Sequence, residues 1–372
     1  MAASILEFDT VALDFIPEQD ESGKRKPVLK ILDQTKLPGK VEYLSLWKLE
    51  EIRDAIYLLK VRGAPAIGVA AAIGMYAVAS SINTDNYEDF LAAFEAAGER
   101  LSSARPTAVN LFWALERMAK VVRLNRDKTV ETVKMLLKTE ALKIRDEDVA
   151  ASRKIGEYGL SLLKDGDGIL THCNAGQLAA VKYGTALAPV HLGRERGYNF
   201  RVYTSETRPL LQGARLTAFE LMAAGVDTTL ICDNMASQVM KNGWVQAVLA
   251  GCDRMAANGD ACNKIGTSAL AILAKHYGIP FYICLPVSTI DMNIKTGVDI
   301  IIEERDPGEV TGLWYREPMT PPGVKVFNPA FDVTGSDLIT AIITERGIAR
   351  PPYHESLREF TMNNTGINLK SS

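Results

Sequence analysis

The chain of 372 residues is long enough for about two domains of ordinary size. Its 42 lysines and arginines against 45 aspartates and glutamates leave no basic excess to neutralise a nucleic-acid backbone or an anionic membrane surface, so we expect neither partner. With 47% hydrophobic and 23% charged residues, the composition is that of a folded protein.

The N-terminal region predicts short antiparallel strands, because residues 6–46 alternate apolar and polar positions between Asp, Pro and Gly turns. Acidic residues in MAASILEFDTVALDF stand where a signal peptide needs basic ones, so we expect no export signal. The five cysteines lack the dense spacing of a secreted disulfide framework. Reduced thiols in the cytoplasm are therefore expected.

Residues 47–164 have a helical pattern that no convincing strand interrupts. The uncharged stretch from Gly63 to Thr84 is long enough to raise the question of a membrane span. It consists mostly of Ala and Gly, and Ala contributes little to membrane transfer, so we expect a buried helix. We assign residues 1–150 to an N-terminal domain of short strands followed by helices.

From Asp165 onward, short apolar runs alternate with helical segments, which is typical of a parallel α/β sheet. The runs expected to form strands are GILTHC, FRVYTSE, TTLICD, VQAVLAGCD, FYICLP and DIIIEE. We assign residues 151–372 to a Rossmann-like catalytic domain. The predicted fold class is α/β, with a parallel-sheet C-terminal domain and a smaller, mostly helical N-terminal domain.

Polar side chains follow four successive predicted strands. They are His172, Cys173 and Asn174; then Glu206, Thr207 and Arg208; then Asp233 and Asn234; and then Asp253 and Arg254. In open parallel sheets, ligands bind at the carboxyl ends of the strands. This edge of the sheet is the predicted active site.

A candidate phosphate site lies in VRGAPAIG, residues 61–68, where Arg62 and Gly63 precede a helix whose first residue we expect to be Pro65. Free N–H groups at a helix start, with a bidentate Arg, suit a phosphate, although a tight turn with a solvated Arg has the same pattern. Arg105, expected just before another helix, and Lys264, expected to open a third, are further candidate cations. Because the chain has no Walker loop and no GxGxxG, these cations fit a sugar phosphate better than a nucleotide.

Two side chains are candidates for proton transfer. THCNAG places Cys173 where a strand is expected to lead into a helix, whose dipole would favour the thiolate; a small buried thiol is the alternative. Asp253, in GCDRMAANGDACNKIGT, precedes a Gly- and Asn-rich loop that we expect to close over a ligand. Asp253 would act there as a general acid or base, or would cap the following turn.

The remaining polar motifs are less specific. Gln212 in QGARLTA would hydrogen-bond sugar hydroxyls or cap its own helix. Cys252 and Cys262 do not form a CxxC motif and have no His nearby, so we expect no zinc.

The chain resembles the 5-methylthioribose-1-phosphate isomerase family of methionine salvage in the segments VRGAPAIG, ARPTAVNLFWAL, THCNAG, TRPLLQGARLTA, DNM, GCDRMAANGDACNKIGT and FNPAFDVT. That family is similar in fold to the regulatory α, β and δ subunits of the guanine-nucleotide exchange factor of translation initiation. It is also similar in fold to archaeal ribose-1,5-bisphosphate isomerases, so the fold alone does not decide the function.

The resemblance implies that Cys173 and Asp253 are catalytic. It also implies phosphate and sugar contacts by Arg62, Gly63, Ala64, Arg105, Gln212, Asn263 and Lys264. It further implies a homodimer that takes a small sugar phosphate and needs no metal, nucleotide or other cofactor. Retention of Cys173 and Asp253 favours an isomerase over a non-enzymatic regulatory subunit, whereas a bisphosphate isomerase would need extra cations at the sugar 5-position.

Overall fold

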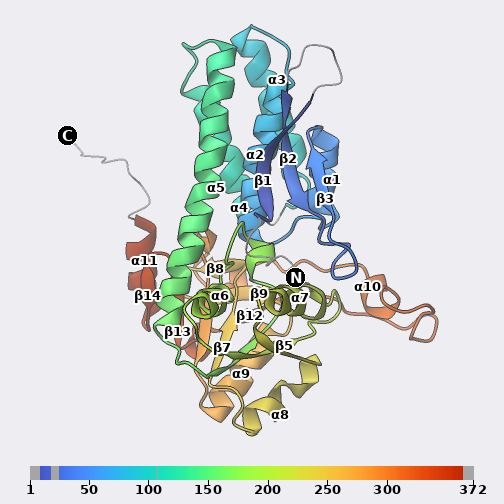
Figure 1. The fold of residues 1–372 in the computed structure, drawn as a ribbon, viewed down its shortest axis with the longest axis vertical. Coiled ribbons are helices and arrows are strands. Elements are labelled where there is room, and N and C mark those ends of the chain that lie inside the picture. Colours follow the sequence, from blue (N-terminus) through green and yellow to red (C-terminus); the bar gives the residue numbers. More distant parts are fainter. Residues whose placement is uncertain (1–8, 18–24, 107, 363–372) are drawn as a thin grey trace. The chain divides into compact units, whose positions relative to one another are not determined.

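The computed structural model describes residues 9–17, 25–106 and 108–362, and its ribbon is drawn in Figure 1. The chain forms two compact units. The N-terminal unit comprises the described residues up to Ser152 together with Gly176–Gly184. The C-terminal unit comprises Arg153–Ala175 and the described residues from Thr185 onward. The segment Gly176–Gly184 therefore leaves the C-terminal half of the sequence and packs in the N-terminal unit.

The N-terminal unit contains an antiparallel sheet in the order β1-β2-β3, as predicted. Its strands are β1 (Val11–Pro17), β2 (Arg25–Leu32) and β3 (Tyr43–Leu46). Leu29 on the central strand pairs with Leu13 and Leu46 on its neighbours, and all three belong to or pack against the core of this unit. The apolar side of the sheet thus faces the helices.

Helices α1 to α4 lie in this unit, and a fifth helix, α5, begins in it. They are α1 (Leu49–Tyr57), α2 (Ala64–Ser80), α3 (Tyr87–Ser102), α4 (Val109–Arg123) and α5 (Val130–Leu160), of which α5 continues into the C-terminal unit. Helix α2 is buried along almost its whole length, which confirms the predicted buried helix. Its small residues allow close packing, since a Cβ on Gly68 would lie 3.1 Å from the carbonyl oxygen of Asn110 in α4. Within the described residues, no helix is both long and apolar enough to cross a membrane.

The C-terminal unit is built on a seven-stranded sheet in the order β14-β13-β10-β7-β4-β5-β6. The strands are β4 (Gly168–Thr171), β5 (Arg201–Ser205), β6 (Asp227–Ile231), β7 (Ala247–Ala250), β10 (Phe281–Cys284), β13 (Ala341–Thr344) and β14 (Gly347–Ala349). All neighbours are parallel except β13 and β14. This is the doubly wound strand order with one antiparallel edge strand, which confirms the predicted Rossmann-like fold.

Helices cover both faces of this sheet. Successive residues of a strand point to opposite faces, so each strand contributes side chains to the packing on both sides. Leu170 and Val248 pack with one set of helices, and Ile169 and Leu249 pack with the other. The first set is α8 (Ala236–Lys241), α9 (Thr267–Tyr277) and α11 (Tyr353–Met362). The second set is the end of α5 with α6 (Ala188–Glu195) and α7 (Ala218–Ala223).

A second, four-stranded sheet has the order β11-β8-β9-β12. Its strands are β8 (Arg254–Ala256), β9 (Ala261–Lys264), β11 (Ile290–Asp291) and β12 (Phe331–Thr334). The prediction of a strand at DIIIEE, residues 299–304, is wrong: the segment forms only an isolated bridge between Glu304 and Pro329. Ile301 is 85% exposed, so this apolar run is not buried in a sheet. A short helix, α10 (Gly308–Thr311), follows it.

Candidate active site

The two predicted reactive residues follow the neighbouring strands at which the sheet order reverses. Thr171 at the end of β4 pairs in parallel with Leu249 of β7. The chain leaves β4 toward α6 on one face and leaves β7 toward α9 on the other. Ligands bind in open α/β sheets at such a switch point. Cys173 lies just beyond β4 and Asp253 just beyond β7, so both belong to this point of the sheet.

Main-chain hydrogen bonds hold Cys173 in an uncommon conformation. Its φ is +60°, a region that costs a residue other than glycine about 1–3 kcal/mol. Its N–H donates to Oγ1 of Thr207 at 2.9 Å, and its carbonyl accepts from Oγ1 of Thr217 at 2.6 Å. Hydroxyls from two other segments therefore fix both ends of this residue.

The predicted helix directly after Cys173 is not there. After β4, the chain first forms a short 3₁₀ helix, Gln177–Ala179, within the segment that packs in the N-terminal unit. The next α-helix, α6, begins only at Ala188. The expectation that a helix dipole acts on Cys173 is therefore wrong, and the two threonine hydroxyls fix its place instead.

Asp253 begins a hairpin and not the loop that we expected to close over a ligand. Its N–H donates to the carbonyl of Cys262 at 2.9 Å, next to the β8–β9 pairing. Two residues before Asp253, Gly251 packs closely against two other segments. A Cβ at Gly251 would lie 2.7 Å from Cβ of Ala175 and 3.9 Å from Oδ1 of Asn263. The end of β7, the segment after Cys173 and strand β9 thus meet at Gly251.

Asn263 and Lys264 lie on β9 and are buried. The Nδ2 of Asn263 donates to Oγ1 of Thr267 at 2.9 Å, and the ammonium of Lys264 lies 4.6 Å from the ring centre of Phe331. Lys264 does not open the next helix, because α9 begins at Thr267. The carboxylate of Asp332 accepts from the N–H groups at that helix start, so Asp332 already caps α9.

Gln212 immediately precedes a π-helical segment, Gly213–Thr217, a rare feature that is frequent at functional sites. Gly213 is packed against the end of β5, since a Cβ there would lie 1.7 Å from the carbonyl oxygen of Ser205. The Oε1 of Gln212 is buried without a hydrogen-bond partner among the residues that the structure describes. Such an atom can accept a hydrogen bond from a ligand hydroxyl.

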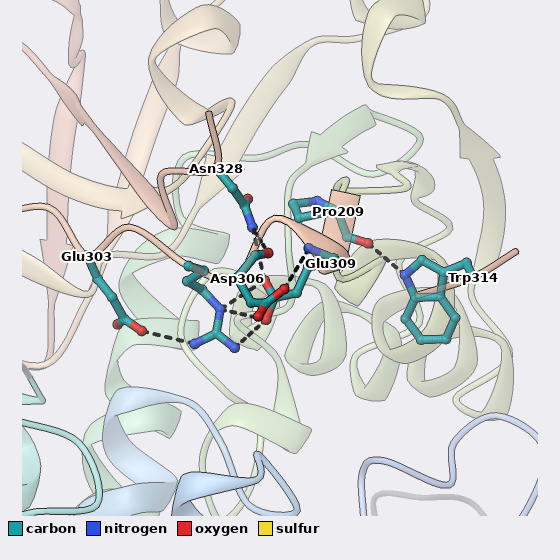
Figure 2. Close-up of polar contacts among 8 residues, drawn as sticks. Pro209, Glu303, Asp306, Glu309, Trp314 and Asn328 are labelled. Atoms are coloured by element: carbon teal, nitrogen blue, oxygen red, sulfur yellow. Dashed lines mark hydrogen bonds and ion pairs between the residues drawn. The ribbon is translucent and has the colours of Figure 1, made fainter. Parts of the chain in front are cut away.

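The segment around α10 anchors the loop that carries Gln212. Trp314 donates from its indole nitrogen to the carbonyl of Pro209 at 2.7 Å, as Figure 2 shows. The guanidinium of Arg215 lies 4.9 Å from the ring centre of Trp314, and Arg208 donates to the carbonyl of Val310 at 2.7 Å. This anchor was not predicted, because about 100 residues separate its partners.

His172, next to Cys173, is buried and its Nε2 lies 2.8 Å from the carbonyl oxygen of Ile265. Burial lowers the pKa of His172, so the ring is neutral near pH 7. Nε2 then carries the hydrogen that Ile265 accepts.

The predicted phosphate-binding residues lie in the N-terminal unit. Gly63 is the N-cap of α2, and Ala64 is the first residue of the helix. Pro65 is therefore its second residue and not, as expected, its first. Arg62, just before the helix, is largely buried. Arg105 lies before α4, whose second residue, Asn110, contacts Gly68 of α2. The two helix starts, with Arg62 and Arg105, therefore lie at the same end of the helix pair.

Both the backbone conformation and the close packing at position 63 require glycine. Its φ is +91°, and a Cβ there would lie 2.4 Å from the carbonyl oxygen of Ala179. We expect Gly63→Ala to lower the free energy of unfolding by about 3 kcal/mol or more, since strain and overpacking add. Chemical denaturation of the purified variant measures this loss.

Gly197→Ala is the matched control, because Gly197 has a φ of +85° and nothing within 4 Å of its Cβ position. It should lose about 1–2 kcal/mol from strain alone. Equal losses in the two variants would show that the contact between Gly63 and Ala179 does not matter.

The surroundings of the other four thiols raise their pKa values. Burial raises the pKa of Cys252 well above its usual value, raises that of Cys262 to about 12 and raises that of Cys284. Cys232 is exposed, and the nearby carboxylate of Glu206 raises its pKa. Among the described residues, no group of three or more His, Cys, Asp or Glu side chains could hold a metal ion.

Comparisons with known proteins agree on one family. The family model of the initiation factor 2 subunit family matches residues 60–351. The chain is 64% identical over 340 residues to the methylthioribose-1-phosphate isomerase of Symbiobacterium thermophilum, which covers 91% of this chain and 94% of that protein. It is 57% identical over 334 residues to the 5-deoxyribose 1-phosphate isomerase of Petrotoga mobilis, covering 90% and 96%.

A solved structure shows the same arrangement of the chain. The crystal structure of 5-methylthioribose 1-phosphate isomerase from Pyrococcus horikoshii is similar with a TM-score of 0.87. It is 43% identical in sequence, and the match covers 98% of each chain.

Proposed function

The chain belongs to the initiation factor 2 subunit family, and we propose that within it this protein is an aldose–ketose isomerase that converts 5-methylthioribose 1-phosphate to 5-methylthioribulose 1-phosphate. The observation that carries the proposal is that Cys173 and Asp253, the two candidates for proton transfer, follow the adjacent strands β4 and β7. The relative at 64% identity, which has this activity in its name, supports it. Methionine salvage is the proposed context.

The proposed reaction needs one acid and one base. Phosphate on the anomeric oxygen prevents spontaneous opening to a free aldehyde, so a proton must be supplied to the ring oxygen as its bond to C1 breaks. Hydrogen then moves from C2 to C1. If it moves as a hydride, a base takes the proton of the 2-hydroxyl. If an enol forms instead, the base takes the C2 proton, C1 is protonated afterwards, and the 2-hydroxyl loses its proton as C2 becomes the carbonyl carbon. Cys173 and Asp253 are the proposed acid and base for either route.

The remaining predicted residues have proposed binding roles. Arg62, Gly63, Ala64 and Arg105 would hold the phosphate, which suits two arginines beside helix starts. Gln212, Asn263 and Lys264 would contact the sugar. The buried Oε1 of Gln212 and the buried amide of Asn263 beside Gly251 support this proposal.

A panel of four compounds tests the function. We expect turnover of 5-methylthioribose 1-phosphate and of 5-deoxyribose 1-phosphate, because both lack a charged group at C5. Ribose 1,5-bisphosphate should have a kcat/KM at least about 10²-fold lower, since a site that takes the methylthio group is proposed to be apolar and would not accept a second phosphate. Methylthioribose without phosphate should bind at least about 10²-fold more weakly, because charge-assisted hydrogen bonds contribute about 1.5–3 kcal/mol each. Product formation and inhibition constants are the measurements.

The panel separates the alternatives. Preferred turnover of the bisphosphate would identify a ribose-1,5-bisphosphate isomerase. Binding without turnover of any compound would favour a regulatory subunit. Equally tight binding of methylthioribose without its phosphate would contradict the phosphate-binding residues and leave the reaction itself standing.

The cellular setting is proposed from the resemblance and the sequence. A homodimer in the cytoplasm is proposed, with no nucleic-acid or membrane partner. The near-equal counts of basic and acidic residues, 42 and 45, support the absence of polyanionic partners. The reaction moves hydrogen within one molecule, so it needs no external oxidant, and no cofactor is proposed.

A further inference from the structure

A buried chain of hydrogen bonds in the C-terminal unit ends at the main-chain carbonyl of Cys173. None of its side chains has a part in the proton transfer proposed above. Glu220 of α7 accepts from Nε2 of His191 in α6 at 3.0 Å and from Nδ2 of Asn174 at 3.0 Å. Asn174 Nδ2 also donates to Oγ1 of Thr217 at 3.1 Å, and Thr217 donates to the carbonyl of Cys173 at 2.6 Å. His191, Glu220 and Thr217 are fully buried, and Asn174 is nearly so.

Each bond in this chain sets the direction of the next. The Oε2 of Glu220 accepts from the amino group of Asn174, which fixes the orientation of that amide. That amino group donates to the oxygen of Thr217. The single hydroxyl hydrogen of Thr217 is then left for the carbonyl of Cys173. Glu220 therefore acts on Cys173 through two intermediate residues.

The other end of Cys173 is held in a similar way. Its N–H donates to Thr207 Oγ1, and that hydroxyl donates to the carbonyl of Ser205 at 3.1 Å. The N–H of Thr207 in turn donates to the carboxylate of Asp233 at 2.8 Å. A residue with a φ of +60° persists only where its surroundings hold it. Here the hydroxyls of Thr207 and Thr217 hold Cys173, while Asp233 accepts from the N–H of Thr207 and Asn174 links Thr217 to Glu220.

Stability alone does not account for the buried carboxylate. Desolvating a charged group is costly, and apolar residues of similar volume often serve a core equally well. Fully satisfied polar networks, in contrast, specify one arrangement of the groups around them. We propose that Glu220, Asn174 and Thr217 are positioning residues that hold the Cys173 thiol in its reactive place. This inference rests on the proposed function for the role of the thiol.

Thr217 variants test the last link. Thr217→Val keeps the shape and removes the donor, so we expect kcat to fall at least about tenfold with KM changed less than about threefold. Thr217→Ser restores the hydroxyl and should retain kcat within about threefold of wild type. Thr344→Val is the matched control. Thr344 is fully buried in β13, and its hydroxyl accepts from the N–H of Arg346 and donates to the carbonyl of Gly347, so its loss should leave kcat unchanged.

Glu220→Gln separates positioning from stability. The glutamine oxygen can still accept from Asn174, while its amino group must donate to His191, which then carries its hydrogen on Nδ1. That atom is buried without a hydrogen-bond partner among the described residues. The variant should therefore have a lower Tm than Thr217→Val but a higher kcat. If kcat instead follows Tm across all four variants, the network is only structural and the proposal is wrong.

Labelling with iodoacetamide gives a readout that does not need turnover. Peptide mass spectrometry follows Cys173, with the exposed Cys232 as internal reference. Release of the Cys173 carbonyl in Thr217→Val should raise its labelling rate at least about threefold relative to Cys232, and Thr217→Ser and Thr344→Val should not. Equal labelling in all variants would overturn the positioning role. If wild type fails to isomerise methylthioribose 1-phosphate, the proposed function fails, and labelling still decides the positioning.

Discussion

Cys173→Ser is expected to lower kcat by at least about 10²-fold, because general acid–base groups contribute about 10²- to 10⁴-fold. Serine keeps the shape of the side chain and removes its acidity. The backbone bonds to Thr207 and Thr217 remain, so the fold and the substrate Kd should persist. Measured kcat and Kd, with circular dichroism to confirm folding, test this expectation.

Three other cysteines serve as controls. Cys262→Ser and Cys284→Ser should cost mainly stability, because both thiols are buried. Cys232 is exposed, so Cys232→Ser should change neither stability nor kcat. If well-folded Cys173→Ser keeps more than about a tenth of wild-type kcat, the thiol contributes less than about 1.4 kcal/mol to lowering the barrier, and its assigned role fails.

Asp253→Asn should likewise lower kcat by at least about 10²-fold with little change in Kd, because the amide keeps the shape but cannot exchange a proton. Asp253 begins the β8–β9 hairpin through a main-chain bond to Cys262, and the substitution does not remove that bond. A loss of turnover therefore reports on the carboxylate and not on the hairpin. The same measurements of kcat, Kd and folding apply.

Asp227→Asn is the matched control for this variant. Asp227 is the first residue of β6 and is exposed, so it lies at the opposite, amino-terminal edge of the same parallel sheet. Its loss should leave kcat unchanged. Equal activities of Asp253→Asn and Asp227→Asn would remove Asp253 from the proposed mechanism.

Much of the C-terminal fold could be predicted because its signals are local. Short apolar runs such as GILT and FYIC alternate with helices, and such a pattern is stable only as a sheet covered on both faces. Parallel strands all end at the same edge, so the sequence alone predicts that the polar residues after β4 and β7 lie together. The strand predicted at residues 299–304 is wrong because an apolar run does not have to be buried, and Ile301 is exposed.

The surroundings of Cys173 could not be predicted. The sequence places Cys173 after a strand, but the usual following helix is replaced by the segment Gly176–Gly184, which packs in the other unit. Likewise, Asn258 and Gly259 indicate a loop, whereas they form the turn between β8 and β9. A local pattern does not reveal which distant segment a loop packs against.

By itself, the sequence determined the α/β class, the family, the buried α2 and the strand ends at which Cys173 and Asp253 lie. The tertiary structure alone decided what holds Cys173 and the loop that carries Gln212: Glu220 lies 46 positions from Asn174, and Trp314 lies 105 positions from Pro209. The physical reason is the range of the forces involved. Strand direction and hydrophobic period are properties of neighbouring residues, whereas a buried hydrogen bond forms only where packing brings separate segments within about 3 Å.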